Sequence, residues 1–386
     1  MTERDLAQGV LEGDRLALAR TLSQVENGTV EGKSALSVLF PFTGKAHLVG
    51  VTGASGTGKS SLVNQLALYY RKRTKGASGP AKGASISAER VSGPAKGASI
   101  SVERASGPLQ GAGPRRIAIV AVDPTSPFTG GAILGDRIRM RDLAGDPEVF
   151  IRSMATRGSL GGIASSTAAV VQVLDAAGYD LILIETVGAG QSEVDIARLA
   201  HTTIVVEAPG LGDDIQAIKA GILEIADVLV VNKADLPGVE NTERALRGSL
   251  NLAHPLRLAI PMPNRFMHHG KLEMVPDQPS VPDASETLWV PPILRTVALD
   301  GMGLPELAEA IAKHRTHLEA TGGWKRKERW RLQTELDLLI QNALVEGFRL
   351  RLPAGAYEQA LEDVQERRIS PNQAVEKLVN GTGKVT

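Results

Sequence analysis

Short runs of consecutive apolar residues recur along most of the chain, and segments with helical spacing separate them. The runs cover residues 47–52, 116–123, 148–152, 180–185, 202–207, 227–232 and 292–297. Strands that are apolar on both sides are typical of a parallel sheet, because helices bury both of its faces. We therefore expect an α/β protein with a mainly parallel sheet covered by helices on both faces.

Helical spacing extends the picture toward both ends of the chain. Residues 3–26 predict one amphipathic helix, and further helices are expected over 59–73, 161–177 and 193–200. After about residue 303 the pattern is helical throughout. This last region carries a narrow apolar seam, made of Leu332, Leu336, Leu339 and Ala343. Such a seam on a terminal helix is either part of the core or a surface for self-association.

Two segments interrupt the alternating pattern. Residues 78–91 are followed at once by a near-copy at 92–105, and both copies are rich in Gly, Pro and Ser. This composition cannot bury a core, so we expect a flexible surface insertion over 74–115, with a docking arm as the alternative. Residues 261–291 are rich in Pro and polar residues and predict a long loop, in which His268 and His269 are interpreted as surface residues.

Composition and charge exclude several classes of function. Lys and Arg total 43 and Asp and Glu also total 43, so no overall basic field favours nucleic acid. The absence of cysteine rules out disulfides, thiolate metal sites and a cysteine nucleophile. The N-terminus lacks the apolar stretch of a signal peptide, and no window is apolar enough for a membrane span. We expect a cytoplasmic protein with neither nucleic-acid nor membrane partners.

The sharpest chemical signal is a glycine-rich turn between a predicted strand and a predicted helix. It fits GxxxxGK[ST], the pattern of a phosphate-binding loop, in which backbone N–H groups and the helix N-terminus surround phosphate oxygens. Within it, Lys59 can bridge the β- and γ-phosphates and Ser60 can offer its hydroxyl to Mg²⁺. The expected nucleotide-binding residues here are Gly53, Ala54, Ser55, Gly56, Thr57, Gly58, Lys59, Ser60 and Ser61.

A second motif, Asn232-Lys233-Ala234-Asp235, directly follows a predicted strand. A carboxylate at Asp235 can accept hydrogen bonds from both the ring N–H and the exocyclic amine of guanine. Adenine offers no matching pair of donors, so the carboxylate would be left unpaired. The sequence therefore predicts that Asn232, Lys233 and Asp235 bind a guanine nucleotide.

Acidic residues at two other strand ends are candidates for the metal and the reaction. Glu185 precedes Gly188, whose N–H can meet the γ-phosphate, and Asp123 ends another strand. Asp136 follows on a glycine-rich stretch. Because Mg²⁺ prefers hard oxygen ligands, we expect its site to comprise Ser60, Asp123, Asp136 and Glu185. The expected catalytic residues are Lys59, Asp123, Glu185 and Gly188.

The chain resembles the MeaB/ArgK family of P-loop GTPases, which are associated with methylmalonyl-CoA mutase. The resemblance is carried by stretches across nearly the whole sequence: VGVTGASGTGKSSLVNQL (49–66), VAVDPTSPFTGGAILGDRIRM (120–140), FIRSMATRGSLGG (150–162), DLILIETVGAGQSEVDI (180–196), EAPGLGDDIQAIKAGILEIADVLVVNKAD (207–235) and PPILRTVALDGMGLPEL (291–307). The PTSPFTGGAILGDRIRM and ETVGAGQSE runs are specific to this group.

The resemblance implies more than the residues alone do. It implies a P-loop NTPase fold and a GTPase that acts as a chaperone of an adenosylcobalamin-dependent acyl-CoA mutase, gating cofactor loading and protecting or reactivating the enzyme. It also implies that Val297, Ala298 and Leu299 touch the base through their backbone, and that 210–219 is a mobile loop. Finally, it implies a homodimer formed by the C-terminal helices, which favours self-association for the apolar seam.

We accordingly expect an N-terminal helical segment over 1–43, a P-loop GTPase domain over 44–318 and a C-terminal dimerisation segment over 319–386. Two alternative functions stay open. One is an ATPase or kinase linked to lysine, arginine or ornithine transport. The other is a GTPase that assembles a metallocentre or targets proteins, although the absence of cysteine disfavours metal handling.

Overall fold

The computed structural model describes residues 3–77, 116–124, 140–143, 145–156, 162–186, 192–210, 225–259 and 288–381. Within these residues the central feature is a sheet of seven parallel strands in the order β3-β2-β4-β1-β5-β6-β7. The strands are β1 (His47–Thr52), β2 (Ile117–Pro124), β3 (Val149–Thr156), β4 (Leu181–Thr186), β5 (Thr202–Glu207), β6 (Val228–Val231) and β7 (Ile293–Arg295). The predicted parallel sheet is confirmed, with a strand in each of the apolar runs.

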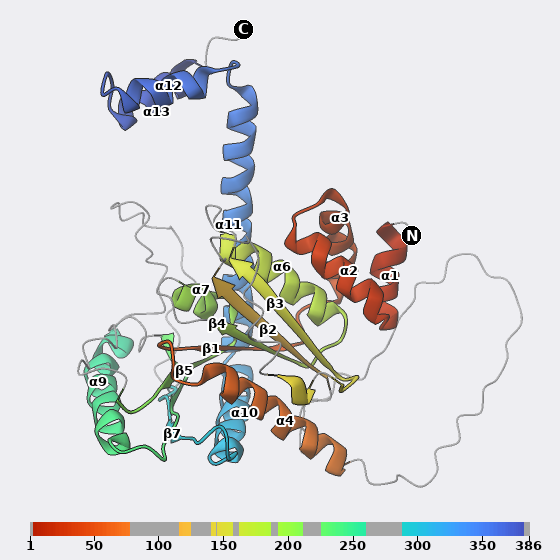
Figure 1. Ribbon diagram of the computed structural model, residues 1–386, viewed down its shortest axis with the longest axis vertical. Coiled ribbons are helices and arrows are strands. Elements are labelled where there is room, and N and C mark those ends of the chain that lie inside the picture. Colours follow the sequence, from red (N-terminus) through yellow and green to blue (C-terminus); the bar gives the residue numbers. More distant parts are fainter. Residues whose placement is uncertain are drawn as a thin grey trace, which may run out of the picture.

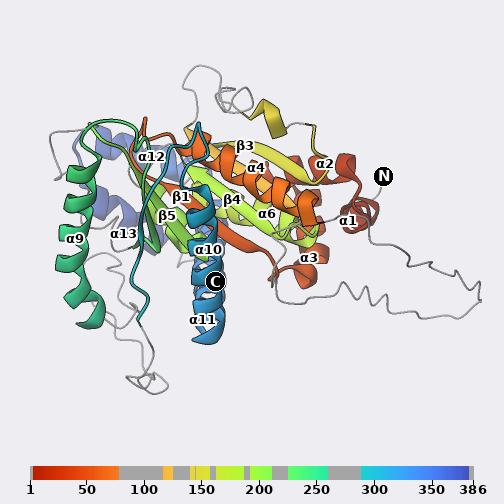
Figure 2. The same ribbon diagram turned by 90° about the horizontal axis from the view of Figure 1, so that it is seen from below.

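Helices cover both faces of the sheet (Figure 1, Figure 2). On one face, α4 (Lys59–Ala77) and α10 (Leu304–Ala320) form a core with alternate residues of β1 and β4. On the other face, α6 (Gly162–Ala176) and α7 (Ser192–Leu199) pack on the remaining residues of those strands. A smaller core lies between β6 and α9 (Val239–Ala259), and η2 (Arg141–Leu143) precedes β3. These two layers explain why the central strands are apolar on both sides.

The N-terminal helices pack on α6 (Figure 1). They comprise α1 (Glu3–Glu12), α2 (Arg15–Glu26), α3 (Val30–Leu39) and the short η1 (Phe40–Phe42). The predicted single helix over 3–26 is therefore wrong. Gly13 adopts a φ of 87°, which ends α1, and the Asp14 side chain caps α2 by accepting a hydrogen bond from the N–H of Leu16.

The C-terminal helices form an arm that projects from the body (Figure 1). The arm starts with α11 (Gly323–Arg351), which carries α12 (Ala356–Gln365) and α13 (Pro371–Gly381) at its far end. The apolar seam lies on the projecting part, where Leu336 is 57% exposed and Leu339 is 50% exposed. Leu332 is half-buried, but the rest of the seam is exposed, which favours self-association over the core among the two alternatives drawn from the sequence. None of the described helices is long and apolar enough to cross a membrane.

The residues that carry the tandem repeat, most of the segment expected to be a Pro-rich loop, with His268 and His269, and residues 211–224, which include most of the expected mobile loop at 210–219, lie outside the described residues. The division of the chain into segments 1–43, 44–318 and 319–386 stays a prediction.

Candidate nucleotide site

The glycine-rich turn links the end of β1 to the start of α4, as the sequence predicts. Gly53, Gly56 and Gly58 have φ values of 135°, 83° and 90°, which other residues rarely adopt. A Cβ atom on Gly53 would lie 2.0 Å from the carbonyl oxygen of Val206, and one on Gly58 would lie 2.5 Å from Nδ2 of Asn232. Glycine is therefore required at both positions by backbone conformation and by close neighbours.

Lys59, the first residue of α4, reaches back across this turn. Its Nζ donates hydrogen bonds to the carbonyl oxygens of Gly53 at 2.8 Å and Ala54 at 2.9 Å. The side chain is buried, so its charge is held inside the loop rather than in solvent. This places a fixed positive charge beside the turn that is predicted to surround phosphate groups.

Ser60 and Glu185 meet at the carboxyl ends of the strands. The Ser60 hydroxyl donates a hydrogen bond to Oε1 of Glu185, which is buried near the end of β4. Side chains alternate along a strand, so Glu185 shares the face of Leu181 and Leu183, which pack toward α4. The structure thus brings together two of the predicted metal ligands from segments far apart in the sequence.

The other predicted metal and catalytic residues are only partly described. Asp123 lies at the end of β2, at the same edge of the sheet, but its side chain is outside the described part. Asp136 and Gly188 lie outside the described residues altogether. Their roles stay predictions.

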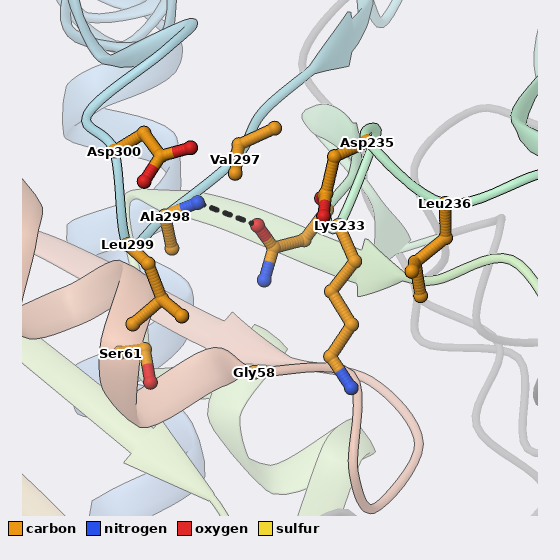
Figure 3. Close-up of a pocket in the computed structure, with 10 residues that line it drawn as sticks. Gly58, Ser61, Lys233, Asp235, Leu236, Val297, Ala298, Leu299 and Asp300 are labelled. Atoms are coloured by element: carbon orange, nitrogen blue, oxygen red, sulfur yellow. Dashed lines mark hydrogen bonds between the residues drawn. The ribbon is translucent and has the colours of Figure 1, made fainter.

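A pocket of about 300 Å³ lies next to the glycine-rich turn (Figure 3). It gathers residues from three segments that sequence analysis treated separately. Its lining comprises Gly58, Ser61, Asn232, Lys233, Asp235, Leu236, Val297, Ala298, Leu299 and Asp300. The residues expected to bind the guanine base therefore share one cavity, beside residues expected to bind the phosphates.

Asn232 holds the three segments together. Its Nδ2 donates to the carbonyl oxygen of Thr57 at 2.8 Å, and its Oδ1 accepts from the Ala298 N–H at 3.1 Å. Oδ1 also accepts from the hydroxyl of Thr296 at 3.0 Å. Because Asn232 is buried, these bonds fix the turn, the strand end and the 296–299 segment in one arrangement.

The sequence profile of the family described as methylmalonyl-CoA mutase-associated GTPase MeaB matches residues 18–79 and 79–351. The chain belongs to this family. It is 37% identical to a protein of Pyrococcus abyssi that is provisionally named a GTPase, over 97% of this chain and 95% of that relative. It is 34% identical to a probable GTPase of Mycobacterium tuberculosis, over 92% of this chain and 94% of the relative.

A solved structure supports the fold of this MeaB-family chain. The crystal structure titled LAO/AO transport system kinase covers 99% of this chain and 98% of its own, with a TM-score of 0.55 and 22% identity. The similarity shows the P-loop NTPase fold. The profile match and the relatives identify this MeaB-family protein as a GTP hydrolase.

Sequence analysis missed several residues of the pocket. Thr296 is buried and anchors Asn232, and Leu236 and Asp300 line the cavity. Thr296 could have been noticed as a polar residue inside an apolar run, directly before the predicted base-binding segment. The relevance of Leu236 and Asp300 depends on how the loops fold back, and the sequence carries no signal for it.

Sequence analysis also missed a buried group of histidines at the opposite, amino edge of the sheet. Nε2 of His47 lies 2.8 Å from the hydroxyl oxygen of Thr202, which lies 2.9 Å from Nδ1 of His314. Nε2 of His201 lies 2.6 Å from Oε1 of Glu328, on α11. This histidine group joins the base of the arm to the first residues of β1 and β5.

Burial sets the ionisation of the histidine group. It lowers the pKa of His314 to about 4, with the charge of Lys327 acting in the same direction and that of Asp227 opposing it. Burial also lowers the pKa of His47 and of His201. The histidines are therefore neutral at neutral pH. Among the described residues, no cluster of histidine and acidic side chains is arranged to hold a metal ion.

Proposed function

We propose that this protein uses GTP binding and hydrolysis to act as a chaperone of an adenosylcobalamin-dependent acyl-CoA mutase, with methylmalonyl-CoA mutase as the first candidate. In this role it gates loading of the cobalamin cofactor and protects or reactivates the enzyme. The observation that carries the proposal is the pocket in which Asn232 links the glycine-rich turn to Asp235 and the 296–299 segment, in a chain of the MeaB family.

The choice of guanine rests on the place of Asp235 in that pocket. Its carboxylate would accept two hydrogen bonds from guanine, whereas adenine would leave it unpaired. Asn232 and Lys233 line the same cavity as Val297, Ala298 and Leu299, whose backbone would touch the base in our proposal. This arrangement disfavours the alternative of an ATP-dependent kinase in amino-acid transport.

The site also fits a magnesium ion. Ser60 and Glu185 supply a hydroxyl and a carboxylate next to the turn, and such hard oxygen ligands suit Mg²⁺. In our proposal Asp123 and Asp136 complete its surroundings, and the bound ion would neutralise charge on the phosphates during hydrolysis. Lys59 would add a second positive charge, and the N–H of Gly188 would meet the γ-phosphate.

The proposed link to the client is the ordering of loops by the γ-phosphate. Residues 123–140 and 186–192 follow strands that end at the site, so contacts made only with the triphosphate would hold them and hydrolysis would release them. In the ETVG segment no glutamine directly follows Gly188 to position water. Hydrolysis is therefore expected to be slow for the isolated protein and faster when the mutase surface orders the loops.

We further propose that the protein forms a homodimer through its arm. The projecting part of the arm exposes large apolar side chains, namely Leu336, Leu339, Ile340, Leu344, Val345 and Leu350 on α11, with Tyr357, Leu361, Val375 and Val379 on α12 and α13. Contiguous exposed apolar surface is costly in water and is typical of an interface.

The decisive test measures GTP turnover by the purified protein with and without apo-mutase. We expect a marked acceleration by the mutase, and no turnover of ATP in either condition. Equal GTP turnover with and without mutase would contradict the chaperone proposal. Displacement of labelled GDP by ATP as readily as by GTP would instead favour the transport kinase.

A pull-down with this protein as bait identifies the client directly. It is carried out once with GDP and once with a non-hydrolysable GTP analogue. We expect an acyl-CoA mutase to be captured in a nucleotide-dependent manner. Capture of a metallocentre or targeting component instead would favour the assembly-factor alternative.

A further inference from the structure

Two buried threonine hydroxyls meet where β1 and β4 leave the sheet. The hydroxyl of Thr186 donates a hydrogen bond to Oγ1 of Thr52 at 3.2 Å, and the two residues are 1% and 0% exposed. We propose that this threonine pair is a positioning element that holds Glu185 in place relative to the glycine-rich turn. It therefore sets the rate of GTP hydrolysis rather than the affinity for nucleotide.

The register of the sheet explains why the two hydroxyls face each other. Gly50 pairs with Ile184 and Val51 pairs with Glu185 in the parallel ladder between β1 and β4. Since side chains alternate, Val51 and Glu185 lie on the α4 face, whereas the next residues of both strands lie on the α6 and α7 face. The threonine pair thus lies at the same strand ends as Glu185 and Ser60, but on the opposite face of the sheet.

The pair lies one position beyond the backbone pairing of these two strands. The backbone register between β1 and β4 ends at Val51 and Glu185, while Thr52 and Thr186 still pair with β5 and β2. Thr52 directly precedes Gly53, whose carbonyl oxygen accepts from Lys59. Thr186 directly follows Glu185. The hydrogen bond therefore connects Thr52, next to the residue that binds Lys59, to Thr186, next to Glu185. It does so one position beyond the end of the backbone register between β1 and β4.

Loss of the bond should affect hydrolysis and binding differently. The glycine-rich turn and the base pocket are held by Asn232 and by the Lys59 contacts, which join residues outside β4, whereas the hydrogen bond from Ser60 to Glu185 joins the turn to β4. GDP, which lacks the γ-phosphate, should therefore bind almost as well. Glu185 would lose its fixed position, because a buried hydroxyl without a partner drives the strand end to rearrange.

The test uses isosteric variants and needs no client protein. Thr186→Val is expected to lower kcat for GTP about tenfold, while the Kd for GDP stays within about twofold. Thr52→Val should act in the same way from the other strand and provides the test should Thr186→Val fail to fold. Thr186→Ser keeps the hydroxyl and should restore turnover. The double valine variant should be no slower than the slower single variant, because both changes remove one interaction.

Thr202→Val is the matched control. It removes a buried, hydrogen-bonded hydroxyl at the opposite end of the sheet, so it should lower thermal stability without changing the ratio of kcat to GDP affinity.

Three results would overturn the proposal: a kcat within twofold of the parent for both single variants, a parallel fall in kcat and GDP affinity, or a double variant whose loss is the product of the single losses. The inference rests on the GTP hydrolysis of the proposed function but not on its client. A parent protein without GTP turnover would refute the proposed function, whereas unaffected variants of an active parent would refute only the inference.

Discussion

In the proposed GTP site, Asp235 is the residue expected to decide the base preference. Replacing it with asparagine exchanges two acceptor oxygens for one acceptor and one N–H donor. We expect Asp235→Asn to weaken GDP binding on the order of 100-fold and to improve binding of the xanthine nucleotide, whose C2 carbonyl can accept from the new donor. Calorimetry with both diphosphates measures the change.

A control for this substitution is Asp337→Asn, which alters an exposed carboxylate on α11, away from the pocket. It should leave both affinities as they are. Unchanged guanine preference in Asp235→Asn would mean that another group reads the base.

At this scale the sequence predicted most of the pocket, because the glycine-rich turn and the Asn-Lys-Ala-Asp motif are local patterns. The contact between the turn and the motif could not be predicted from such local patterns. The hydrogen bond from Asn232 to Thr57 joins residues 175 positions apart, and it exists only because β1 and β6 belong to one parallel sheet. The hydrogen bond from Thr296 to Asn232 is equally non-local, and the only local sign of it is a polar residue inside an apolar run.

Among the elements, α11 is docked on the body through its first half. The contacts include Lys327 Nζ to Asp227 Oδ2 at 2.9 Å and the bond between Glu328 and His201, beside the stacking of Trp324 on His201. The neutral histidines nearby are the pH-sensitive part of this contact. Docking of the arm should therefore depend on pH.

The expected dependence follows from the lowered pKa of His314. Between its usual value of 6.5 and the folded value of about 4, the unfolded chain binds more protons than the folded one. The free energy of unfolding should therefore fall as the pH falls from 6.5 toward 4, by about 2 kcal/mol between pH 7 and pH 5 from His314 alone.

His47 and His201 shift in the same direction and should add to the effect. Urea unfolding at a series of pH values, followed by circular dichroism, measures the slope. His314→Gln should flatten it. A parent protein that is equally stable at pH 7 and pH 5 would contradict this account of the histidine group.

The predicted elements agree with the structure where the apolar pattern is continuous and local, as in the strands. The break between α1 and α2 was missed because the apolar spacing carries on across Gly13 and Asp14. Helices often tolerate a glycine, so the sequence alone does not show whether a helix ends there. The φ of 87° at Gly13 shows that α1 does end.

At the scale of the whole molecule, the proposed homodimer depends on the exposed apolar side chains of the arm. Changing both Leu336 and Leu339 to glutamate places charge in the middle of the exposed apolar face. We expect this variant to sediment as a monomer where the parent is a dimer, with GDP affinity unchanged because the arm lies outside the nucleotide pocket.

Leu16→Glu is a fair comparison for the arm variant, since Leu16 is as exposed as Leu336 but lies on α2. It should leave the parent dimer intact. A parent that is already monomeric at high concentration would rule out this assembly.

The distribution of tryptophan has a practical consequence. Trp289 donates to the carbonyl oxygen of Asp227, Trp324 stacks on His201 with ring centroids 3.8 Å apart, and Trp330 lies on α11. These are the three tryptophans of the chain, so its tryptophan emission, excited where tyrosine does not absorb, originates around the foot of the arm. A change in that emission when GTP replaces GDP would show, without an added label, that nucleotide exchange at the carboxyl edge of the sheet alters the structure at the amino edge.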